Sequence, residues 1–462
     1  MSHDSASPEP NRRRGARRVA RLLLIALLSV AVVPLASEEA WSAGSTRTTS
    51  KSSRTSSSTT KRKTTSTKSK RTQRSPRTGR AAKPAAVPVG NPIDHLVGPS
   101  DVLVVVGPNG ARIRNVNPSL SFVPASTLKV VTALVALERL GPEYRFKTTF
   151  LVDDEGRLVI EGGGDPYLVS EELALIADRL AARAPARGFT GIRVDDSAFA
   201  RGLTVPGSSD TANPYDAPVG ALSANFNTIS VRRLKNGLAS GEAQTPLTPT
   251  AREIAMGWNF RSWARLSLRD PDVTARYTGE LIAAMLRDRG VAVGGTVERL
   301  ASRPAGLTAL YVHEQSRPLA EVLRECLKTS SNFIANQVFL TMALETYGAP
   351  ATFEKGARVV LGHLAARGLA DGFQIVEGSG LSRDNQATAE SFLRVLAEFE
   401  PWIGLLRTHE GSPSKTGTLS GTRTLVGYFD HEKLGHLHYV IFLDGNRSGV
   451  RFELVRLFRD YL

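Results

Sequence analysis

The clearest pattern of apolar positions along the chain lies between residues 126 and 140. Apolar residues recur there at steps of three and four positions, at Leu128, Val131, Leu134, Val135, Leu137 and Leu140. This spacing predicts a helix with one wide buried face, which ends at Gly141-Pro142. We therefore expect Ser126 at or near the N-terminus of a buried helix, where unpaired backbone N–H groups favour negative charge.

Short apolar runs bounded by Gly and Pro predict strands near both ends of the globular part. Two hairpins are expected, one from residues 101–106 and 111–116, the other from residues 424–430 and 438–443. Helices are expected over 319–328, 333–346 and 353–367, and a last amphipathic helix over 450–461. Strands at both ends with helices between them predict one sheet assembled from the two termini, which is an α+β arrangement.

The middle of the chain has a different pattern of predicted elements. Short strands and Gly/Pro turns continue to about residue 305, interrupted by predicted helices near 171–183 and 272–289. The segment from residue 150 to residue 306 is long enough to form a domain of ordinary size. We expect residues 91–149 and 307–462 to form one domain, split by an inserted β-rich domain at 150–306.

The sequence before residue 91 predicts targeting and a tether. Six arginines between positions 12 and 21 precede an uncharged apolar run, 22–36, which has the length of a signal-peptide core. We expect residues 1–43 to be a signal peptide or an uncleaved membrane anchor, so that the protein is exported to the periplasm or cell envelope. Residues 44–90 hold 13 Lys and Arg and no Asp or Glu, which predicts a disordered linker. Alternatively, this strip contacts anionic membrane lipid or envelope polymers.

Charge and cysteine content argue against a nucleic-acid-binding protein and against a fold held by disulfides or a cysteine-rich metal site. The net charge is +15, but residues 1–90 carry 19 Lys and Arg against four Asp and Glu, and residues 91–462 carry 40 of each. The folded part is electrically balanced, so we expect no nucleic-acid partner. The single cysteine, Cys326, permits no intramolecular disulfide and no cysteine-rich metal site. It lies on the apolar side of a predicted helix, as a small buried hydrophobe would.

Candidate chemistry begins with Ser126 and Lys129, whose spacing places hydroxyl and amine on the same helix face. A serine hydroxyl becomes a good nucleophile when a base takes its proton, and a partly buried lysine can be that base because desolvation lowers its pKa. Ser-x-x-Lys also arises by chance, as a helix cap and a solvated lysine. The pair therefore needs support from elsewhere in the chain.

Two further motifs supply that support. Ser330-Ser331-Asn332 stands at the junction of two predicted helices, where side chains can point into a cleft. Lys415-Thr416-Gly417-Thr418 precedes the predicted strand 424–430. Its lysine suits a substrate carboxylate, its glycine permits close approach to the backbone, and the following N–H can donate to an oxyanion. All three motifs in this order, each on a suitable element, are a strong signal of one active site.

With these motifs the chain resembles the penicillin-binding, active-site-serine D-alanyl-D-alanine carboxypeptidases. It is most similar to their class C low-molecular-mass group, whose catalytic domain is split by an insertion after the first motif. The resemblance covers about residues 91–462. It is carried by Pro-Ala-Ser-Thr-Leu-Lys at 124–129, Gly-Asp-Pro at 164–166, Val-Asp-Asp-Ser at 194–197, Ala-Leu-Ser-Ala-Asn-Phe-Asn at 221–227, Gly-Ser-Gly-Leu-Ser-Arg at 378–383 and Lys-Thr-Gly-Thr-Leu at 415–419.

The resemblance implies a serine β-lactamase/transpeptidase-like fold and a role for each motif residue. Ser126 would be the acylated nucleophile, Lys129 its general base, and Ser330 a proton relay to the leaving group. Asn332 would hold the substrate amide. The Lys415-Thr416-Gly417-Thr418 motif would bind substrate, with Lys415 and Thr416 on the terminal carboxylate and the N–H groups of Ser126 and Thr418 as the oxyanion hole. Two positions depart from the family, since Asn336 and Glu377 stand where it more often has Glu and Asp.

The implied function is a serine-type D-Ala-D-Ala carboxypeptidase, with D-alanyl endopeptidase action as a further activity. Its partners would be peptidoglycan peptides ending in D-Ala-D-Ala, with β-lactams as covalent inhibitors. No metal or cofactor is expected, because His431 and His436 are five residues apart in a hairpin, whereas the metalloprotease motif needs a spacing of four on a helix. Two alternatives stay open: a β-lactamase-like or other amide or ester hydrolase of the same fold, and a non-catalytic envelope-binding protein.

Overall fold

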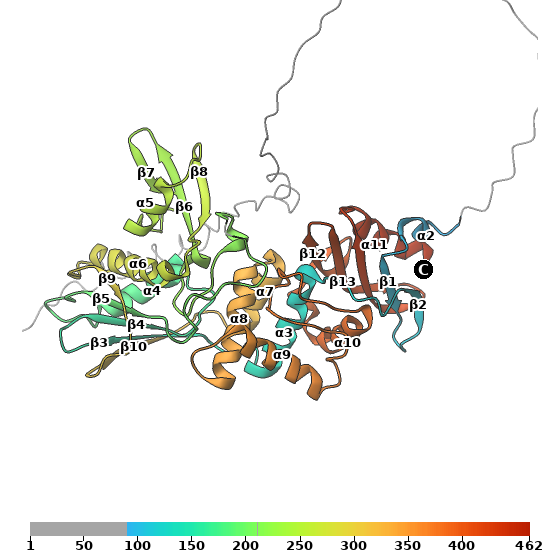
Figure 1. Cartoon of the computed structure of the whole chain (residues 1–462), viewed down its shortest axis with the longest axis horizontal. Coiled ribbons are helices and arrows are strands. Elements are labelled where there is room, and N and C mark those ends of the chain that lie inside the picture. The colour runs from blue at the N-terminus through green and yellow to red at the C-terminus, as the bar shows by residue number, and fades with distance from the viewer. Residues whose placement is uncertain (1–89, 210) are drawn as a thin grey trace, which may run out of the picture. The chain divides into compact units, whose positions relative to one another are not determined.

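The computed structural model of the protein describes residues 90–462 except residue 210. The predicted signal segment, 1–43, and all of the predicted basic linker except Gly90 lie outside the described residues. Within the described part, no helix is both long enough and apolar enough to cross a membrane. The described elements are labelled in Figure 1.

The N-terminal and C-terminal strands share one sheet, as the apolar pattern predicts. This six-stranded sheet has the order β11-β12-β13-β14-β1-β2 and is antiparallel throughout. Its strands are β1 (Val102–Val106), β2 (Arg112–Val116), β11 (Arg407–His409), β12 (Ser412–Leu419), β13 (Thr422–His431) and β14 (Gly435–Asp444). Val104 lies opposite Val440, and the first strands therefore lie beside the last ones in Figure 1.

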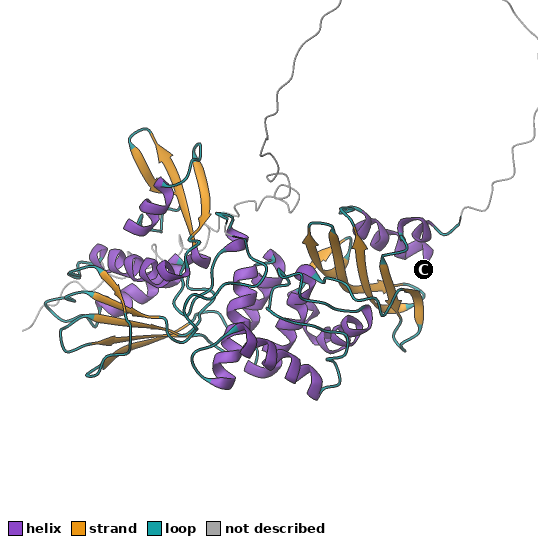
Figure 2. Ribbon diagram, in the orientation of Figure 1, coloured by secondary structure: helices purple, strands orange, loops and turns teal. Residues whose placement is uncertain are grey.

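Side chains alternate between the two faces of this sheet, and each face is covered by helices. On one face, Leu103 and Ile441 pack with Leu454 of α11 (Val450–Tyr461), which contacts the short helix α2 (Pro92–Leu96). On the other face, Val104 and Val440 belong to the core that includes α3 (Leu128–Leu140) and α10 (Ala389–Phe399). Figure 2 shows α3 and α10 beside this sheet.

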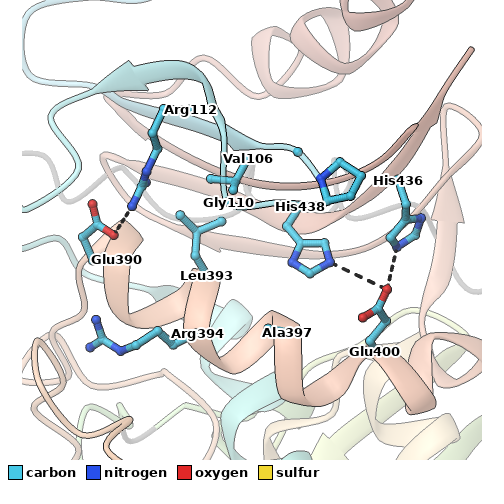
Figure 3. A pocket seen from close by; sticks show the side chains of 12 residues that line it. Val106, Gly110, Arg112, Glu390, Leu393, Arg394, Ala397, Glu400, His436 and His438 are labelled. Carbon is cyan, nitrogen blue, oxygen red and sulfur yellow. Dashed lines mark hydrogen bonds and ion pairs between the residues drawn. The ribbon is translucent and has the colours of Figure 1, made fainter. Parts of the chain in front are cut away.

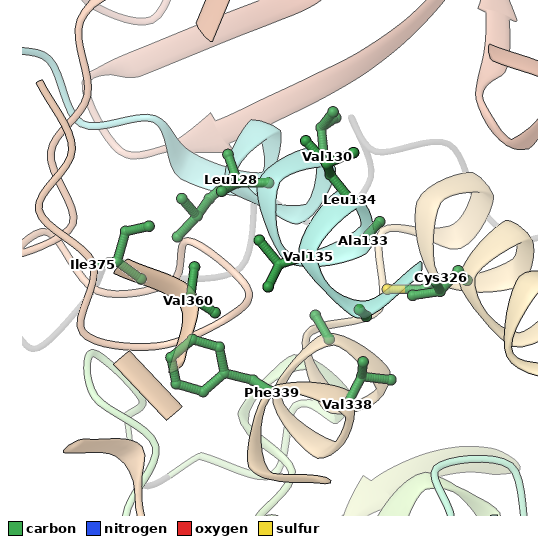
Figure 4. Packing of buried hydrophobic residues seen from close by; sticks show 14 of the residues in the cluster. Leu128, Val130, Ala133, Leu134, Val135, Cys326, Val338, Phe339, Val360 and Ile375 are labelled. Atoms are coloured by element: carbon green, nitrogen blue, oxygen red, sulfur yellow. The ribbon is translucent and has the colours of Figure 1, made fainter. Parts of the chain in front are cut away.

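Helix α3 is the centre of this core. It contacts α7 (Leu319–Thr329), α8 (Asn332–Tyr347), α9 (Phe353–Ala366) and α10. In Figure 4, Cys326 of α7, Val338 of α8 and Val360 of α9 surround its side chains. All ten residues from 128 to 137 are buried. The helix is therefore buried on all sides over this stretch, and not on one face only as the apolar spacing predicts. The polar positions are buried because they are paired: the Thr132 hydroxyl donates to the Gly378 carbonyl at 2.7 Å.

The middle of the chain builds two further sheets. One has five strands in the order β10-β3-β4-β5-β9, and the other three in the order β7-β6-β8. The first consists of β3 (Lys147–Val152), β4 (Leu158–Gly162), β5 (Ile192–Asp195), β9 (Val297–Arg299) and β10 (Thr308–Glu314). The second consists of β6 (Thr228–Leu234), β7 (Gly237–Ser240) and β8 (Trp263–Ser267), accompanied by α5 (Pro249–Met256).

Two helices supply the core of this middle region. Helices α4 (Ser170–Ala181) and α6 (Thr274–Asp288) contact each other and lie close to the bounds expected from the sequence. Ile176 and Ile282 pack with Ile160 of the five-stranded sheet. Strand β10 pairs with β3, so this sheet includes residues on both sides of the expected boundaries at 149–150 and 306–307.

Candidate active site

Ser126 lies in a single 3₁₀ turn, Ala125–Thr127, which leads directly into α3. The turn is tied to strand β13, because the Thr424 hydroxyl donates to the carbonyl of Pro124 at 2.8 Å. Ala125 has a φ of 48°, a conformation that is unfavourable for a residue with a side chain. The carbonyl oxygen of Ala125 packs against Gly380. A Cβ at position 380 would lie 1.8 Å from that oxygen, so position 380 accepts only glycine. The nucleophile candidate is thus held by neighbours from two distant segments.

Lys129 connects the first two motifs. Its ammonium nitrogen lies 2.8 Å from each of three acceptors, the Ser126 hydroxyl, the Asn332 side-chain oxygen and the Ser379 carbonyl. Its exposed fraction is 1%, whereas Ser126 is partly exposed. Burial of a charged amine is costly unless polar partners surround it, and these three acceptors supply them.

The second motif joins α7 to α8, as the sequence predicts. Ser330 ends α7 in the left-handed conformation, with a φ of 58°, and Ser331 caps α8 by accepting a hydrogen bond from the Ile334 N–H at 3.2 Å. This sharp junction presents Ser330 to the third motif. Lys415 donates to the Ser330 hydroxyl and to the Thr416 carbonyl, both at 2.8 Å.

The third motif lies on β12, with Lys415 and Thr416 buried and Thr418 exposed. At Gly417 the strand passes very close to the nucleophile turn. A Cβ there would lie 2.1 Å from the Thr424 hydroxyl and 3.0 Å from the Ser126 nitrogen. Only glycine lets β12 approach the Ser126 backbone this closely. The structure thus brings Ser126, Lys129 and Asn332 together, pairs Ser330 with Lys415, and places Gly417 beside Ser126.

Three residues outside the motifs support the site, and the sequence analysis assigns none of them a role there. Arg451 of α11 is buried and donates to the carbonyl of Gly417 at 2.7 Å and to the Thr418 hydroxyl at 3.2 Å. The backbone carbonyl of Tyr215, in the 3₁₀ turn Pro214–Asp216, accepts from the Asn332 amide at 3.2 Å. Glu377 is fully buried and is described below. Arg451 and Tyr215 stand in segments without any site motif, so the sequence gives no signal for them.

Glu377 shapes the loop that offers the Ser379 carbonyl to Lys129. Its carboxylate accepts from the Ser379 N–H at 2.7 Å, the Ser379 hydroxyl at 2.6 Å and the Asn385 amide at 2.7 Å. Asn336 holds the same loop by accepting from the Gly378 N–H at 2.8 Å. The two positions that depart from the family pattern therefore stabilise one loop beside Lys129.

Cys326 is a buried thiol, as the sequence predicts. Its exposed fraction is 2%, and burial raises its pKa to about 11, although the charges of Lys129 and Lys415 oppose that shift. A thiol in this state is protonated at neutral pH and is a poor nucleophile.

Comparison with solved structures identifies the fold. The fold matches the crystal structure of penicillin binding protein 4 from Haemophilus influenzae with a TM-score of 0.65 and 21% identity, covering 79% of this chain and 97% of that one. The same protein in complex with a β-lactam gives a TM-score of 0.62 and 20% identity, covering 79% of this chain and 98% of that one. The fold is therefore the α+β fold of the serine β-lactamases and transpeptidases, as expected from the sequence.

Sequence comparison identifies the family. The D-Ala-D-Ala carboxypeptidase 3 (S13) family model matches residues 101–267 and 264–403, more than half of the chain. The chain belongs to this peptidase family. It is 26% identical over 403 residues to the D-alanyl-D-alanine carboxypeptidase DacB of Haemophilus influenzae, covering 73% of this chain and 83% of the relative. It is 28% identical over 407 residues to a D-alanyl-D-alanine carboxypeptidase of an Actinomadura species, covering 71% of this chain and 74% of the relative.

Proposed function

We propose that the protein is a serine-type D-Ala-D-Ala carboxypeptidase that trims peptidoglycan peptides through an acyl-enzyme on Ser126. A further activity is endopeptidase cleavage of D-alanyl cross-links. The observation that carries the proposal is the position of the buried Lys129 side-chain nitrogen, 2.8 Å from both the Ser126 hydroxyl and the Asn332 side-chain oxygen. A base, a nucleophile and a substrate-binding amide thus share one site in a chain of this peptidase family.

The first half of the reaction forms the acyl-enzyme. In its neutral form Lys129 takes the Ser126 hydroxyl proton while Oγ attacks the carbonyl carbon of the D-Ala-D-Ala bond. The N–H groups of Ser126 and Thr418 stabilise the negative charge on the carbonyl oxygen. Ser330 relays a proton from the protonated Lys129 to the nitrogen of the leaving D-alanine as the C–N bond breaks, so that Lys129 is neutral again and Ser330 keeps its hydroxyl. Water then attacks the Ser126 ester, releases the shortened peptide and restores the serine hydroxyl.

The third motif and Asn332 position the substrate. Lys415 and Thr416 bind the terminal carboxylate, and the Asn332 amide holds the peptide group on the other side of the scissile bond. The contact of Lys415 with Ser330 supports this assignment, because it puts a positive charge beside the relay hydroxyl, 2.8 Å away. A β-lactam presents a similar carboxylate and carbonyl, and attack by Ser126 opens its ring to leave a covalent adduct.

We further propose an organisation for the whole chain. Residues 91–149 and 307–462 form the catalytic domain, and residues 150–306 form the inserted domain, to which the β3–β10 pairing adds a few residues at each end. Residues 1–43 direct export to the periplasm or cell envelope as a signal peptide or anchor. The basic residues of segment 44–90 tether the catalytic domain and contact anionic membrane or envelope polymers, an interaction that weakens as salt rises.

Intact-protein mass spectrometry after brief exposure to a penicillin tests the central proposal. We expect one stable adduct on the wild-type chain and on Ser121→Ala, an exposed serine nearby, but none on Ser126→Ala. Ser126→Ala should also lose release of D-alanine from a peptide ending in D-Ala-D-Ala, with an unchanged melting temperature. An adduct on Ser126→Ala would refute the assignment of the nucleophile. A wild-type chain without adduct that leaves penicillin intact would instead indicate a non-catalytic binding protein, and rapid penicillin consumption a β-lactamase.

A further inference from the structure

A pocket of about 390 Å³ lies where α10 meets the six-stranded sheet (Figure 3). None of the residues that line it belongs to the three motifs described above. Arg112, Glu390 and Arg394 line one end, and Glu400, His436 and His438 line the other. The three residues at this second end, which we name the His436 cluster, combine two imidazoles and one carboxylate.

The backbone explains why these three residues meet. His436 and His438 are two positions apart on β14, so their side chains leave the same face of the sheet. Glu400 follows directly after the last residue of α10, which packs on β14. Figure 3 shows the two imidazole rings and the Glu400 carboxylate converging at this end of the pocket.

Distances within the His436 cluster suit a small metal ion. One nitrogen of each ring and one carboxylate oxygen lie within 4.8 Å of one another. Nε2 of His436 is 3.5 Å from Oε1 of Glu400, and Nε2 of His438 is 3.9 Å from the same oxygen. In a tetrahedral zinc site with bonds of 2.0–2.1 Å, neighbouring ligand atoms are about 3.4 Å apart. The two His–Glu400 separations therefore need only small side-chain rotations to reach that value, and the ring nitrogens of His436 and His438 lie within 4.8 Å of each other.

A second observation independently points to a cation. The carboxylate of Asp430 accepts a hydrogen bond from Nδ1 of His436 at 2.5 Å, so the proton of a neutral ring resides on Nδ1 and the lone pair on Nε2. This Nε2 is buried and makes no hydrogen bond to any described residue. When the His436 ring is neutral, two acceptors, its Nε2 and the Glu400 oxygen, therefore face each other. A carboxylate behind a ligating histidine is the usual arrangement at zinc sites.

We propose that Glu400, His436 and His438 bind a Zn²⁺ ion, with Asp430 as the positioning residue that orients His436. Two imidazole nitrogens and one carboxylate oxygen are ligands that zinc accepts, and the pocket leaves a fourth position open. The site differs from the metalloprotease pattern considered above, because His431 is not part of it. The bound ion links the end of α10 to β14.

Calorimetric titration of ZnCl₂ into the metal-stripped full chain tests this proposal. We expect one zinc ion per chain and a rise in melting temperature. Glu400→Gln and His438→Gln should each weaken zinc binding at least about tenfold, and Asp430→Asn about 10- to 100-fold, the usual effect of removing the carboxylate behind a ligating histidine. Asp430 and Glu400 are 87% and 50% exposed at their side chains, so their variants should fold normally.

His363→Gln is the matched control, because His363 also pairs with a carboxylate, that of Glu138 at 2.5 Å, but no second imidazole joins the pair among the described residues. It should bind zinc as the wild type does. The proposal is overturned if the wild-type chain binds no zinc, which would make the His436 cluster a simple ion pair. It is equally overturned if Glu400→Gln and His438→Gln both bind zinc with wild-type affinity.

Discussion

At the scale of single residues, Lys129 is the side chain on which the proposed chemistry depends most. Its three acceptors come from three segments, which are the nucleophile turn, the start of α8 and the loop before α10. Lys129→Ala removes the proton acceptor, and general-base groups contribute about 10²- to 10⁴-fold to rate. We expect the rate of acylation by a chromogenic β-lactam to fall by that factor, measured by stopped-flow absorbance.

A control for Lys129→Ala is Lys147→Ala, which removes a 61% exposed side chain whose ion-pair distance to Glu314 is 3.3 Å. This variant should acylate at the wild-type rate, since exposed ion pairs contribute little. If Lys129→Ala were acylated as fast as the wild type, another group would have to act as the base.

Gly417 is the second residue whose identity the geometry requires. An added methyl would lie 2.1 Å from the Thr424 hydroxyl and 3.0 Å from the Ser126 nitrogen, so β12 or the nucleophile turn must move. We expect Gly417→Ala to slow acylation at least about tenfold and to lower the free energy of unfolding by about 1–3 kcal/mol, the usual cost of overpacking. Gly404→Ala, where a Cβ meets nothing within 4 Å, should change neither quantity. Equal behaviour of the two variants would contradict the proposed close approach.

At the scale of elements, α11 positions the third motif from behind the sheet. Arg451 donates to the carbonyls of Gly417 and Thr424, at 2.7 and 3.3 Å, and to the Thr418 hydroxyl. Arg451→Met leaves those buried carbonyls without this donor, which costs about 1–3 kcal/mol. Because Gly417 and Thr418 line the proposed oxyanion hole, we expect kcat for D-alanine release to fall more than KM rises.

Arg456→Met on the same helix is the comparison, because Arg456 is 59% exposed and lies 3.8 Å from Glu410. Its melting temperature and kcat should match those of the wild type. A loss of stability in Arg451→Met without any change in kcat would limit Arg451 to a structural role.

The sequence predicts elements and motifs well, because both depend on local spacing. Apolar periodicity predicts α3, the two hairpins and the closing helix. The three motifs name the side chains that contact Lys129 and Lys415, but not Ser379, whose backbone carbonyl also accepts from Lys129. The supporting residues outside the motifs depend on long-range packing. From the sequence alone, Arg451 is one of several cations on an amphipathic helix, and Glu377 is a polar residue in a loop. The full burial of α3 also depends on neighbours that its own periodicity does not encode.

At the scale of the whole molecule, buried polar groups join the end of β10 to the segment after β4. Asp165 accepts from the Gln315 amide at 2.9 Å and from the Tyr167 N–H at 2.8 Å. Glu172 of α4 pairs with His313 at 2.8 Å. Burial acts to raise the pKa of Glu172, but hydrogen bonds from His313 and Ser316 outweigh it and lower that pKa. Burial prevails at Asp165 and raises its pKa to about 6.

These shifts predict how stability changes with pH. Asp165 binds a proton below about pH 6 in the folded chain but, with an ordinary pKa of 3.8, only below about pH 4 in the unfolded chain. The folded state therefore binds more protons between pH 4 and 6, and the contribution of Asp165 to stability falls as pH rises through that window. Asp165→Asn cannot titrate, so its stability should not fall in this way. The free energy of unfolding of the variant, measured by urea unfolding, should therefore rise relative to that of the wild type from pH 4 to pH 6.5.

Asp153→Asn provides a comparison of opposite sign. Burial acts to raise the pKa of Asp153, but its hydrogen bonds with Arg157, at 2.8 Å, outweigh burial and lower that pKa. Asp153 therefore stabilises the fold above its unfolded pKa, and this contribution is lost as pH falls. Asp153→Asn should lose stability relative to the wild type as pH rises from 3 to 5. Stability differences that are independent of pH for both variants would mean that neither carboxylate titrates differently in the folded and unfolded chains. If only the Asp165→Asn difference is flat, Asp165 stays ionised in the folded chain down to its ordinary pKa, and its buried partners compensate its charge.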